Sequence, residues 1–258
     1  MNTIVCLALI LLALMLLVGG RKGARSFIAL FLNFGVVIVT LFFLMDPAVD
    51  PVILTLIACT VISAVNLFYI NEINGKTVLA FVSTLLAIAI LLFLIYWIAK
   101  RSMIQGFSEE EADEISIFSL LIGVDFVKIA VSMIIMSTIG AITDVAIAIS
   151  SPAREVFLHH PDISRKELFQ SGMRIGRDIL GSDTNTLFFA FIGGYMALLI
   201  WFRDLDYSIG QIVNSKVFGG EMLIIFSAGI GIALIIPIAA GLNAWWLTRQ
   251  KTGKGREI

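Results

Sequence analysis

Charged residues are scarce in this sequence. Asp, Glu, Lys and Arg make up 14% of its 258 residues, whereas hydrophobic residues make up 59%. A soluble domain usually holds about 25% charged residues, so the composition excludes an ordinary soluble protein and indicates an integral membrane protein. We therefore expect the lipid bilayer as its surroundings and no nucleic-acid partner.

Cysteine and histidine are also rare, with two residues of each. Cys6 and Cys59 lie far apart in apolar runs, which argues against a disulfide framework or a cysteine metal site. His159 and His160 are adjacent and would point apart on a helix, with no ligand at metal-binding spacing. No Ser/His/Asp or Cys/His set has its partners in place, and the glycines at 172–181 do not match a phosphate-binding loop. We predict no metal, no cofactor and no enzymatic activity.

Long apolar runs are abundant, and a helix needs about 20 apolar residues to cross the hydrocarbon. The runs predict one all-α domain over residues 1–258, a polytopic transmembrane helical bundle of about seven spans. The predicted spans are 3–19, 26–45, 52–70, 78–98, 127–150, 186–202 and 222–246. Turn-forming pairs such as Asp46-Pro47 and Asn74-Gly75 separate several of them.

Two polar stretches carry the capping box that opens many helices. Ser108 is followed by Glu111, and Ser164 by Glu167. The second box lies in the segment 151–185, predicted as a cytoplasmic amphipathic connector whose arginines suit the anionic leaflet. The same arginines serve equally well as ordinary topology determinants. The short apolar run 115–124 is predicted as an interfacial or partly re-entrant piece.

Most lysines and arginines fall in alternate connections of this seven-span arrangement. They gather after the first span at Arg21, Lys22 and Arg25, after the fifth span, and in the C-terminal tail. Cytoplasmic loops carry the excess of Lys and Arg. The N-terminus is therefore predicted outside and the C-terminus in the cytoplasm.

Asp144 is an acidic residue inside the apolar run 127–150. A carboxyl group costs roughly 2.5–3.5 kcal/mol at the centre of a membrane helix, and such groups usually mark ion or proton pathways. We predict a pathway cluster in which Asp144 is joined by Thr143, Arg177, Asp178, Asn185 and Thr186. The alternative is a structural carboxyl, held by hydrogen bonds or by an arginine of the connector, and the sequence leaves both open.

Two further sets of residues are structural in our interpretation. Asp125 and Lys128 are three residues apart, which places them on one helix face as an ion pair. Small residues allow helices to pack closely. We expect that role for Gly140, Gly229, Ala233 and Gly241.

Several blocks of the chain form a recognisable set. The first block, residues 140–150, is Gly-Ala-Ile-Thr-Asp-Val-Ala-Ile-Ala-Ile-Ser. The second, residues 171–178, includes Ser-Gly-Met and Ile-Gly-Arg-Asp. The third, residues 185–187, is Asn-Thr-Leu. Earlier blocks are 17–23, which ends the first span, and 74–77. Together these blocks resemble the YibE/F-like family of bacterial membrane proteins. The short connection after the first span resembles the shorter, YibF-like type of that family.

The resemblance implies a bacterial multi-pass protein of the inner membrane, often described as a permease and without an established activity. We expect a transport-related subunit, proton-coupled through Asp144. The resemblance also implies a partner membrane subunit carrying an extracytoplasmic domain, or a homo-oligomer. The alternative is a non-transporting structural or assembly subunit of a membrane complex.

Overall fold

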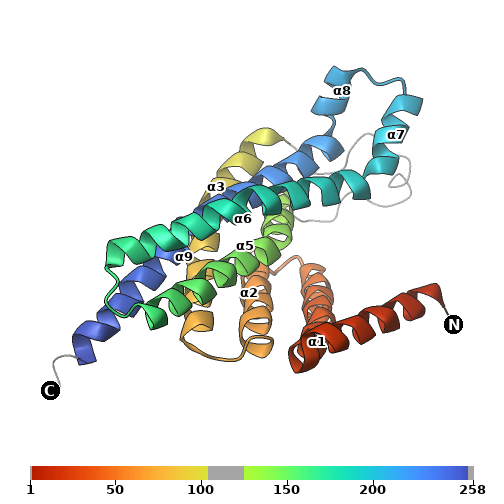
Figure 1. Cartoon of the computed structure of the whole chain (residues 1–258). Helices are drawn as coiled ribbons and strands as arrows, with labels where there is room; N and C mark the ends of the chain where they lie inside the picture. The colour runs from red at the N-terminus through yellow and green to blue at the C-terminus, as the bar shows by residue number, and fades with distance from the viewer. Residues whose placement is uncertain (1, 104–124, 255–258) are drawn as a thin grey trace.

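The computed structural model describes residues 2–103 and 125–254, with side chains described up to residue 249. Every regular element in these ranges is a helix (Figure 1). The elements are α1 (Thr3–Leu44), α2 (Pro51–Ala64), the π-helix η1 (Val65–Tyr69), α3 (Gly75–Ser102), α5 (Phe126–His159), α6 (Arg165–Gly194), α7 (Met196–Asp204), α8 (Ile209–Asn214) and α9 (Lys216–Lys254). The predictions for 108–111 and 115–124 lie outside the described residues.

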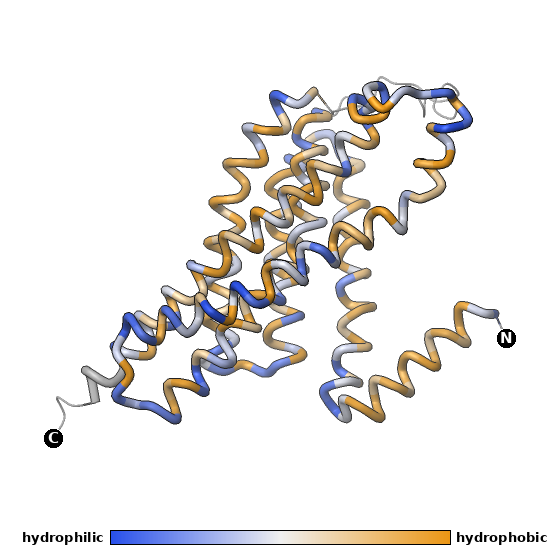
Figure 2. Tube along the Cα trace, turned by 45° about the horizontal axis from the view of Figure 1, so that its top comes forward, coloured by the Kyte–Doolittle hydropathy of each residue, from blue (hydrophilic) through white to orange (hydrophobic). Residues whose placement is uncertain are grey.

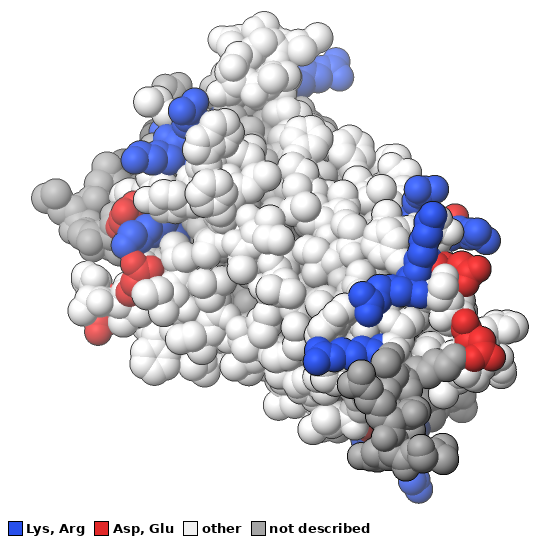
Figure 3. Space-filling model, turned by 90° about the vertical axis from the view of Figure 1, so that its left-hand side faces the viewer, with Lys and Arg blue, Asp and Glu red and all other residues white. Residues whose placement is uncertain are grey.

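Five helices are long and apolar enough to cross a membrane, and there are six if α6 and α7, bent by 50°, form one span. Figure 3 shows charged side chains gathered toward the two ends of the molecule, with a broad uncharged band between them. Large apolar side chains are exposed on several helices, such as Phe93 of α3 at 80%. A surface of this kind suits contact with lipid hydrocarbon, so the predicted helical membrane bundle is confirmed.

The first two predicted spans are the two halves of α1, which are two helices joined at a kink, and the expected loop between them is corrected to the single non-helical residue Gly20. The chain bends at Gly20 (φ 54°, ψ −132°) without leaving helical hydrogen bonding on either side. Figure 1 shows the N-terminal half of α1 standing away from the bundle after this bend. Glycine tolerates this backbone conformation, which a side chain disfavours. The basic residues beyond it indicated a loop, but they continue the helix.

Side-chain caps set the start of several helices. Asp50 accepts hydrogen bonds from the N–H groups of Val52 and Ile53 at the start of α2. Asn74 and Thr77 form a capping box at the start of α3. The predicted box of Ser164 and Glu167 is confirmed at the start of α6. These caps satisfy N–H groups that the first helical turn leaves without a partner.

The centre of the bundle is α5, which packs against α9, α3 and α2. Its residues Ile135, Ile142 and Ile149, seven apart, are at most 1% exposed. The spacing of seven keeps them on one face of the helix. A buried polar contact joins α5 to α9, where Asn243 donates to the Ser150 hydroxyl over 2.9 Å.

The segment 151–185 is not a separate connector. α5 continues through Pro152 to His159, and α6 then runs without a break across the predicted border at 186. α6 lies along α9 and also contacts α5. Figure 2 shows hydrophilic residues along much of α6, which explains why hydropathy alone placed its first half outside the membrane.

The closest glycine packing in this part of the bundle is between α6 and α9. A Cβ atom on Gly172 would lie 2.8 Å from the Ala240 Cβ, and one on Gly176 would lie 2.2 Å from the Ile236 Cγ2. The two glycines are four residues apart, a spacing typical of close helix contacts in membranes. Sequence reasoning missed this pair because it treated the segment as a surface connector.

Of the residues predicted for helix packing, Gly229 and Gly241 of α9 are in contact with α6, whereas Gly140 and Ala233 are not closely packed. Ala233 is exposed, and a Cβ on Gly140 would meet no atom within 4 Å. Gly229 and Gly241 face Thr184 and Phe169 at ordinary contact distances of 3.5 and 3.9 Å. The small residues of 229–241 recur every four positions, which predicted that they form the packed face of the helix. In α9 the residues turned toward the core are instead Ile232, Ile235 and Ala239.

Candidate functional site

Asp144 lines a polar hollow between α1, η1 and α5. The hollow has a volume of about 350 Å³, and it lies near the bend of α1 and the turn before α3. The Asp144 side chain is exposed to it, whereas Thr143 beside it is buried. Its polar lining residues are Lys22, Ser26, Asn33, Asn66, Asn71, Thr143 and Asp144.

Three asparagines hold the walls of the hollow together. Asn33 of α1 donates to the Asn66 side-chain oxygen over 2.7 Å, and Asn71 donates to the Asn66 main-chain oxygen over 3.1 Å. Amide side chains in apolar helices are costly unless they are hydrogen-bonded. The network therefore fixes α1 against η1.

Thr143 anchors the third wall. Its hydroxyl donates to the Ile139 carbonyl and lies 3.3 Å from the Ser63 hydroxyl of α2. Both hydroxyl groups are buried. The contact ties α5 to α2 one residue away from Asp144, so the position of the carboxyl group is set by packed helices.

The π-helix Val65–Tyr69 shapes the hollow from the α2 side. It ends with a bond of 3.4 Å from the Ile70 N–H to the Val65 carbonyl. Single π turns inside longer helices are frequent at functional sites. Here the π turn places Asn66 and Leu67 on the hollow, with Ile70 and Asn71 following.

The Asp144 carboxyl and the Lys22 ammonium have no hydrogen-bond or ion-pair partner among the described residues. Lys22 comes from the turn of α1 just beyond Gly20 and lines the same hollow. The hollow thus contains one acid and one base that are not joined to each other. Such an arrangement allows Asp144 to exchange a proton or a cation.

The structure brings together only part of the predicted cluster. Thr143 and Asp144 share the hollow, but the predicted residues of α6 do not line it. Arg177, Asp178, Asn185 and Thr186 are exposed on α6. The reason is that α6 packs mainly along α9, whereas the hollow is closed by α1 and η1.

Sequence reasoning missed the asparagines and Lys22. The available signal was the presence of Asn33 and Asn66 inside two apolar runs, since uncharged polar residues also mark polar contacts within membranes. The prediction was instead drawn to the polar stretch before the sixth predicted span, which lies on α6.

The predicted pair of Asp125 and Lys128 is also corrected. Asp125 caps the start of α5 by accepting from the N–H groups of Val127 and Lys128. The Lys128 ammonium instead donates to the free oxygen of Asp50, at the start of α2. The spacing of three residues predicted that Asp125 and Lys128 share one face of the helix. Asp125 instead precedes the helix, and its side chain is turned toward the first N–H groups and not toward the Lys128 ammonium.

This ion pair gives a testable pH dependence. The hydrogen bond from Lys128 is the main cause that lowers the pKa of Asp50. The stability it contributes is present above the ordinary pKa of about 3.9 and is lost as the pH falls through the lowered pKa of Asp50 in the folded protein. Asp50→Asn keeps a good helix cap and is expected to unfold at a lower temperature than the wild type at pH 7, with the difference shrinking as the pH falls below about 3.9.

The matched control is Asp46→Asn, in the same turn, because Asp46 has no ion pair among the described residues. Its thermal midpoint should stay parallel to that of the wild type over the whole pH range. A difference between Asp50→Asn and the wild type that is the same at pH 7 and pH 3 would contradict the ion pair.

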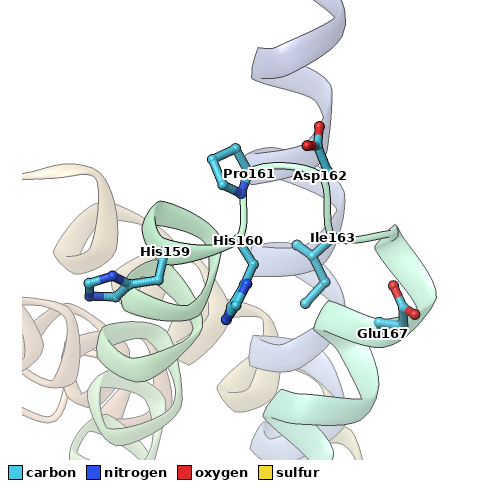
Figure 4. Close-up of a pocket in the computed structure, with 6 residues that line it drawn as sticks. All are labelled: His159, His160, Pro161, Asp162, Ile163 and Glu167. Atoms are coloured by element: carbon cyan, nitrogen blue, oxygen red, sulfur yellow. The ribbon is translucent and has the colours of Figure 1, made fainter.

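A second hollow, of about 500 Å³, lies at the turn between α5 and α6. Figure 4 shows the side chains of His159, His160, Asp162 and Glu167 pointing in different directions around it. Within the described ranges, no group of three or more His, Cys, Asp or Glu side chains is placed to hold a metal ion. The hollow therefore offers no basis for metal chemistry.

Apolar helices of membrane-spanning length, charged ends and a polar hollow beside one helix define a polytopic α-helical membrane protein. Within that class the chain belongs to the YibE/F-like family, whose model matches residues 7–249. No curated protein and no solved structure matches it.

Proposed function

We propose that this protein is a transport-related subunit of the bacterial inner membrane, in which Asp144 accepts and releases a proton or cation. The observation that supports this is an unpaired carboxyl group beside a polar hollow in an otherwise apolar bundle. Ionisable groups in membrane helices usually face a cavity and serve ion or proton pathways. Thr143 and the three asparagines position the walls, and Lys22 lies where it can compete with the transported cation.

The proposed orientation places the hollow toward the cytoplasm. Arg21, Lys22 and Arg25 follow the bend of α1. This bend, the turn before α3, the turn between α5 and α6 and the C-terminus lie toward one end of the molecule (Figure 1). The concentration of basic residues there favours the cytoplasmic side. If the two halves of α1 each cross the membrane and α6 and α7 form one span, the chain crosses seven times and the N-terminus lies outside.

A proton flux assay tests the role of Asp144. Wild-type protein in liposomes is expected to dissipate an imposed pH gradient, and Asp144→Asn to abolish this flux, because an amide does not exchange a proton in this range. Asp178→Asn is the matched control, since Asp178 is exposed on α6 outside the hollow. Flux would be followed with a pH-sensitive dye inside the liposomes.

Carboxyl infrared difference spectra of the same proteins show directly whether Asp144 changes protonation with pH. Equal flux in wild type and Asp144→Asn, together with a carboxyl band that never changes, would assign Asp144 a structural role.

The alternative function is a structural or assembly subunit. The observation that favours it is the N-terminal half of α1, on which Leu17 and Val18 are 83% and 89% exposed. This half extends away from the other helices (Figure 1). In this proposal it binds a partner subunit or a second copy of the chain. Leu17 and Val18 would be replaced with alanine to test this alternative. If the partner subunit or second copy then no longer co-purifies while proton flux is unchanged, assembly is favoured over transport.

A further inference from the structure

A third hollow lies at the basic end of the bundle and is separate from the one beside Asp144. Its volume is about 320 Å³, and α3, α5 and α9 enclose it. Arg154 and Gly75 supply its polar part. Leu79, Phe157, Trp246 and Leu247 supply an apolar wall.

Arg154 is the unusual residue in this hollow. Its side chain is half-buried, yet no acceptor within the described ranges forms an ion pair or hydrogen bond with it. A guanidinium group carries five N–H donors, and burying a charge without a partner is costly. A half-buried, unpaired guanidinium at the edge of a hollow therefore favours an anionic ligand.

The neighbouring backbone adds to this preference. The Arg154 Nη1 atom would lie 2.6 Å from a Cβ on Gly75, so the guanidinium occupies the space that a side chain would fill. Gly75 is the first residue of α3, and the Asn74 side chain caps the N–H groups of Lys76 and Thr77 but not that of Gly75. The positive end of the α3 dipole thus lies beside the guanidinium.

The apolar wall narrows the class of ligand. Trp246 is 43% exposed near the end of α9, and tryptophan concentrates at the interface between hydrocarbon and headgroups. Arginine binds phosphate through two parallel hydrogen bonds. We propose that this hollow binds a phosphate group held by Arg154 beside Gly75, and that the phosphate belongs to an anionic phospholipid whose acyl chain lies on Leu158 and Trp246, the exposed apolar residues of the lining.

The experiment compares ligands by the thermal midpoint of the purified full chain in neutral detergent. Phosphatidylglycerol is expected to raise the midpoint with a saturable dependence, because a ligand that binds the folded state stabilises it. Diacylglycerol with the same chains lacks the phosphate and should have no such effect. An equal shift with diacylglycerol would overturn the phosphate site.

Inorganic phosphate distinguishes the two sources of the group. If inorganic phosphate, at the same concentrations as the lipid, raises the thermal midpoint equally, the lipid part of the proposal is overturned and a free phosphate is the ligand. If it has no effect while phosphatidylglycerol does, the headgroup of a lipid is the ligand.

The variants connect the effect to Arg154. Arg154→Gln is expected to lower the apparent affinity for phosphatidylglycerol about tenfold or more, since hydrogen bonds to charged groups are lost. Arg174→Gln is the matched control, because Arg174 is exposed on α6 outside this hollow. Gly75→Ala displaces the guanidinium and should weaken binding of phosphatidylglycerol in the same way. It replaces Arg154→Gln as the test variant if Arg154→Gln does not fold. Wild-type affinity in both variants would overturn the proposal.

Discussion

Replacing Gly176 with alanine is expected to destabilise the folded bundle by about 1–3 kcal/mol, the usual cost of overpacking a core. The added Cβ would lie 2.2 Å from the Ile236 Cγ2 and 2.9 Å from its Cγ1, which forces α6 and α9 apart. Alanine is the better helix former by about 1 kcal/mol, so a net loss shows that packing outweighs helix propensity. Reversible unfolding of the purified protein in mixed micelles measures the difference.

Gly181→Ala is the matched control for this prediction. Gly181 is on the same helix, and a Cβ there would meet no atom within 4 Å. We expect it to leave stability unchanged or to raise it by up to about 1 kcal/mol. In a double-mutant cycle, Ile236→Ala should cost less in the Gly176→Ala protein than in the wild type, because it removes the two atoms closest to the added Cβ. Equal effects of Gly176→Ala and Gly181→Ala would show that α6 does not lie against α9.

Hydropathy and turn-forming pairs predicted most of the helices, and the capping box of Ser164 predicted the start of α6. The starts of α2, α3 and α6 follow from Asp50, Asn74 and Ser164, because these side chains satisfy N–H groups locally. Local chemistry of this kind depends on residues close in sequence. It therefore requires no knowledge of the packed structure.

The failures share a physical cause. Gly20 was expected to begin a loop, although a glycine bends a helix as readily as it ends one. The polar first half of α6 was expected outside the bundle, although Gly172 and Gly176 let it approach α9. Both outcomes depend on three-dimensional geometry, namely the backbone conformation of Gly20 and the helix that lies against α6, and hydropathy carries neither.

The candidate site was predicted only in part, because its residues come together through the three-dimensional arrangement of the helices. The cost of burying a carboxyl group identified Asp144 as a residue of interest without reference to its neighbours. Its neighbours depend on how the helices are arranged. Lys22 and Asn33 line the hollow from the part of α1 that follows the bend at Gly20, and Asn66 lines it from a π turn. Neither irregularity has a hydropathy signal.

Replacing Gly20 with alanine is expected to straighten α1 and move its N-terminal half. A side chain at φ 54° and ψ −132° costs on the order of 1–3 kcal/mol. Adopting the ordinary helical conformation avoids this cost. Straightening also removes the close approach of Gly23 to the Met15 carbonyl, where a Cβ would lie only 1.8 Å from the oxygen.

Spin labels at positions 9 and 34 measure the change, since Leu9 and Phe34 are exposed on the two halves of α1. Exposed Cys6 would first be replaced with serine, whereas Cys59 is buried. An unbroken helix would separate the labelled backbones by about 37 Å at 1.5 Å per residue, and the bent helix gives a shorter distance. Gly20→Ala should shift the distribution toward the longer value.

Gly19→Ala is the control because Gly19 has no positive φ and a Cβ there would meet no atom within 4 Å. Its distance distribution should match that of the protein with Gly20 intact. Since Lys22 follows the bend and lines the hollow, Gly20→Ala should also alter proton flux if the hollow is the pathway. A short distance retained in Gly20→Ala with unchanged stability would mean that the bend does not depend on glycine, and that contacts beyond Gly20 hold the arm in place.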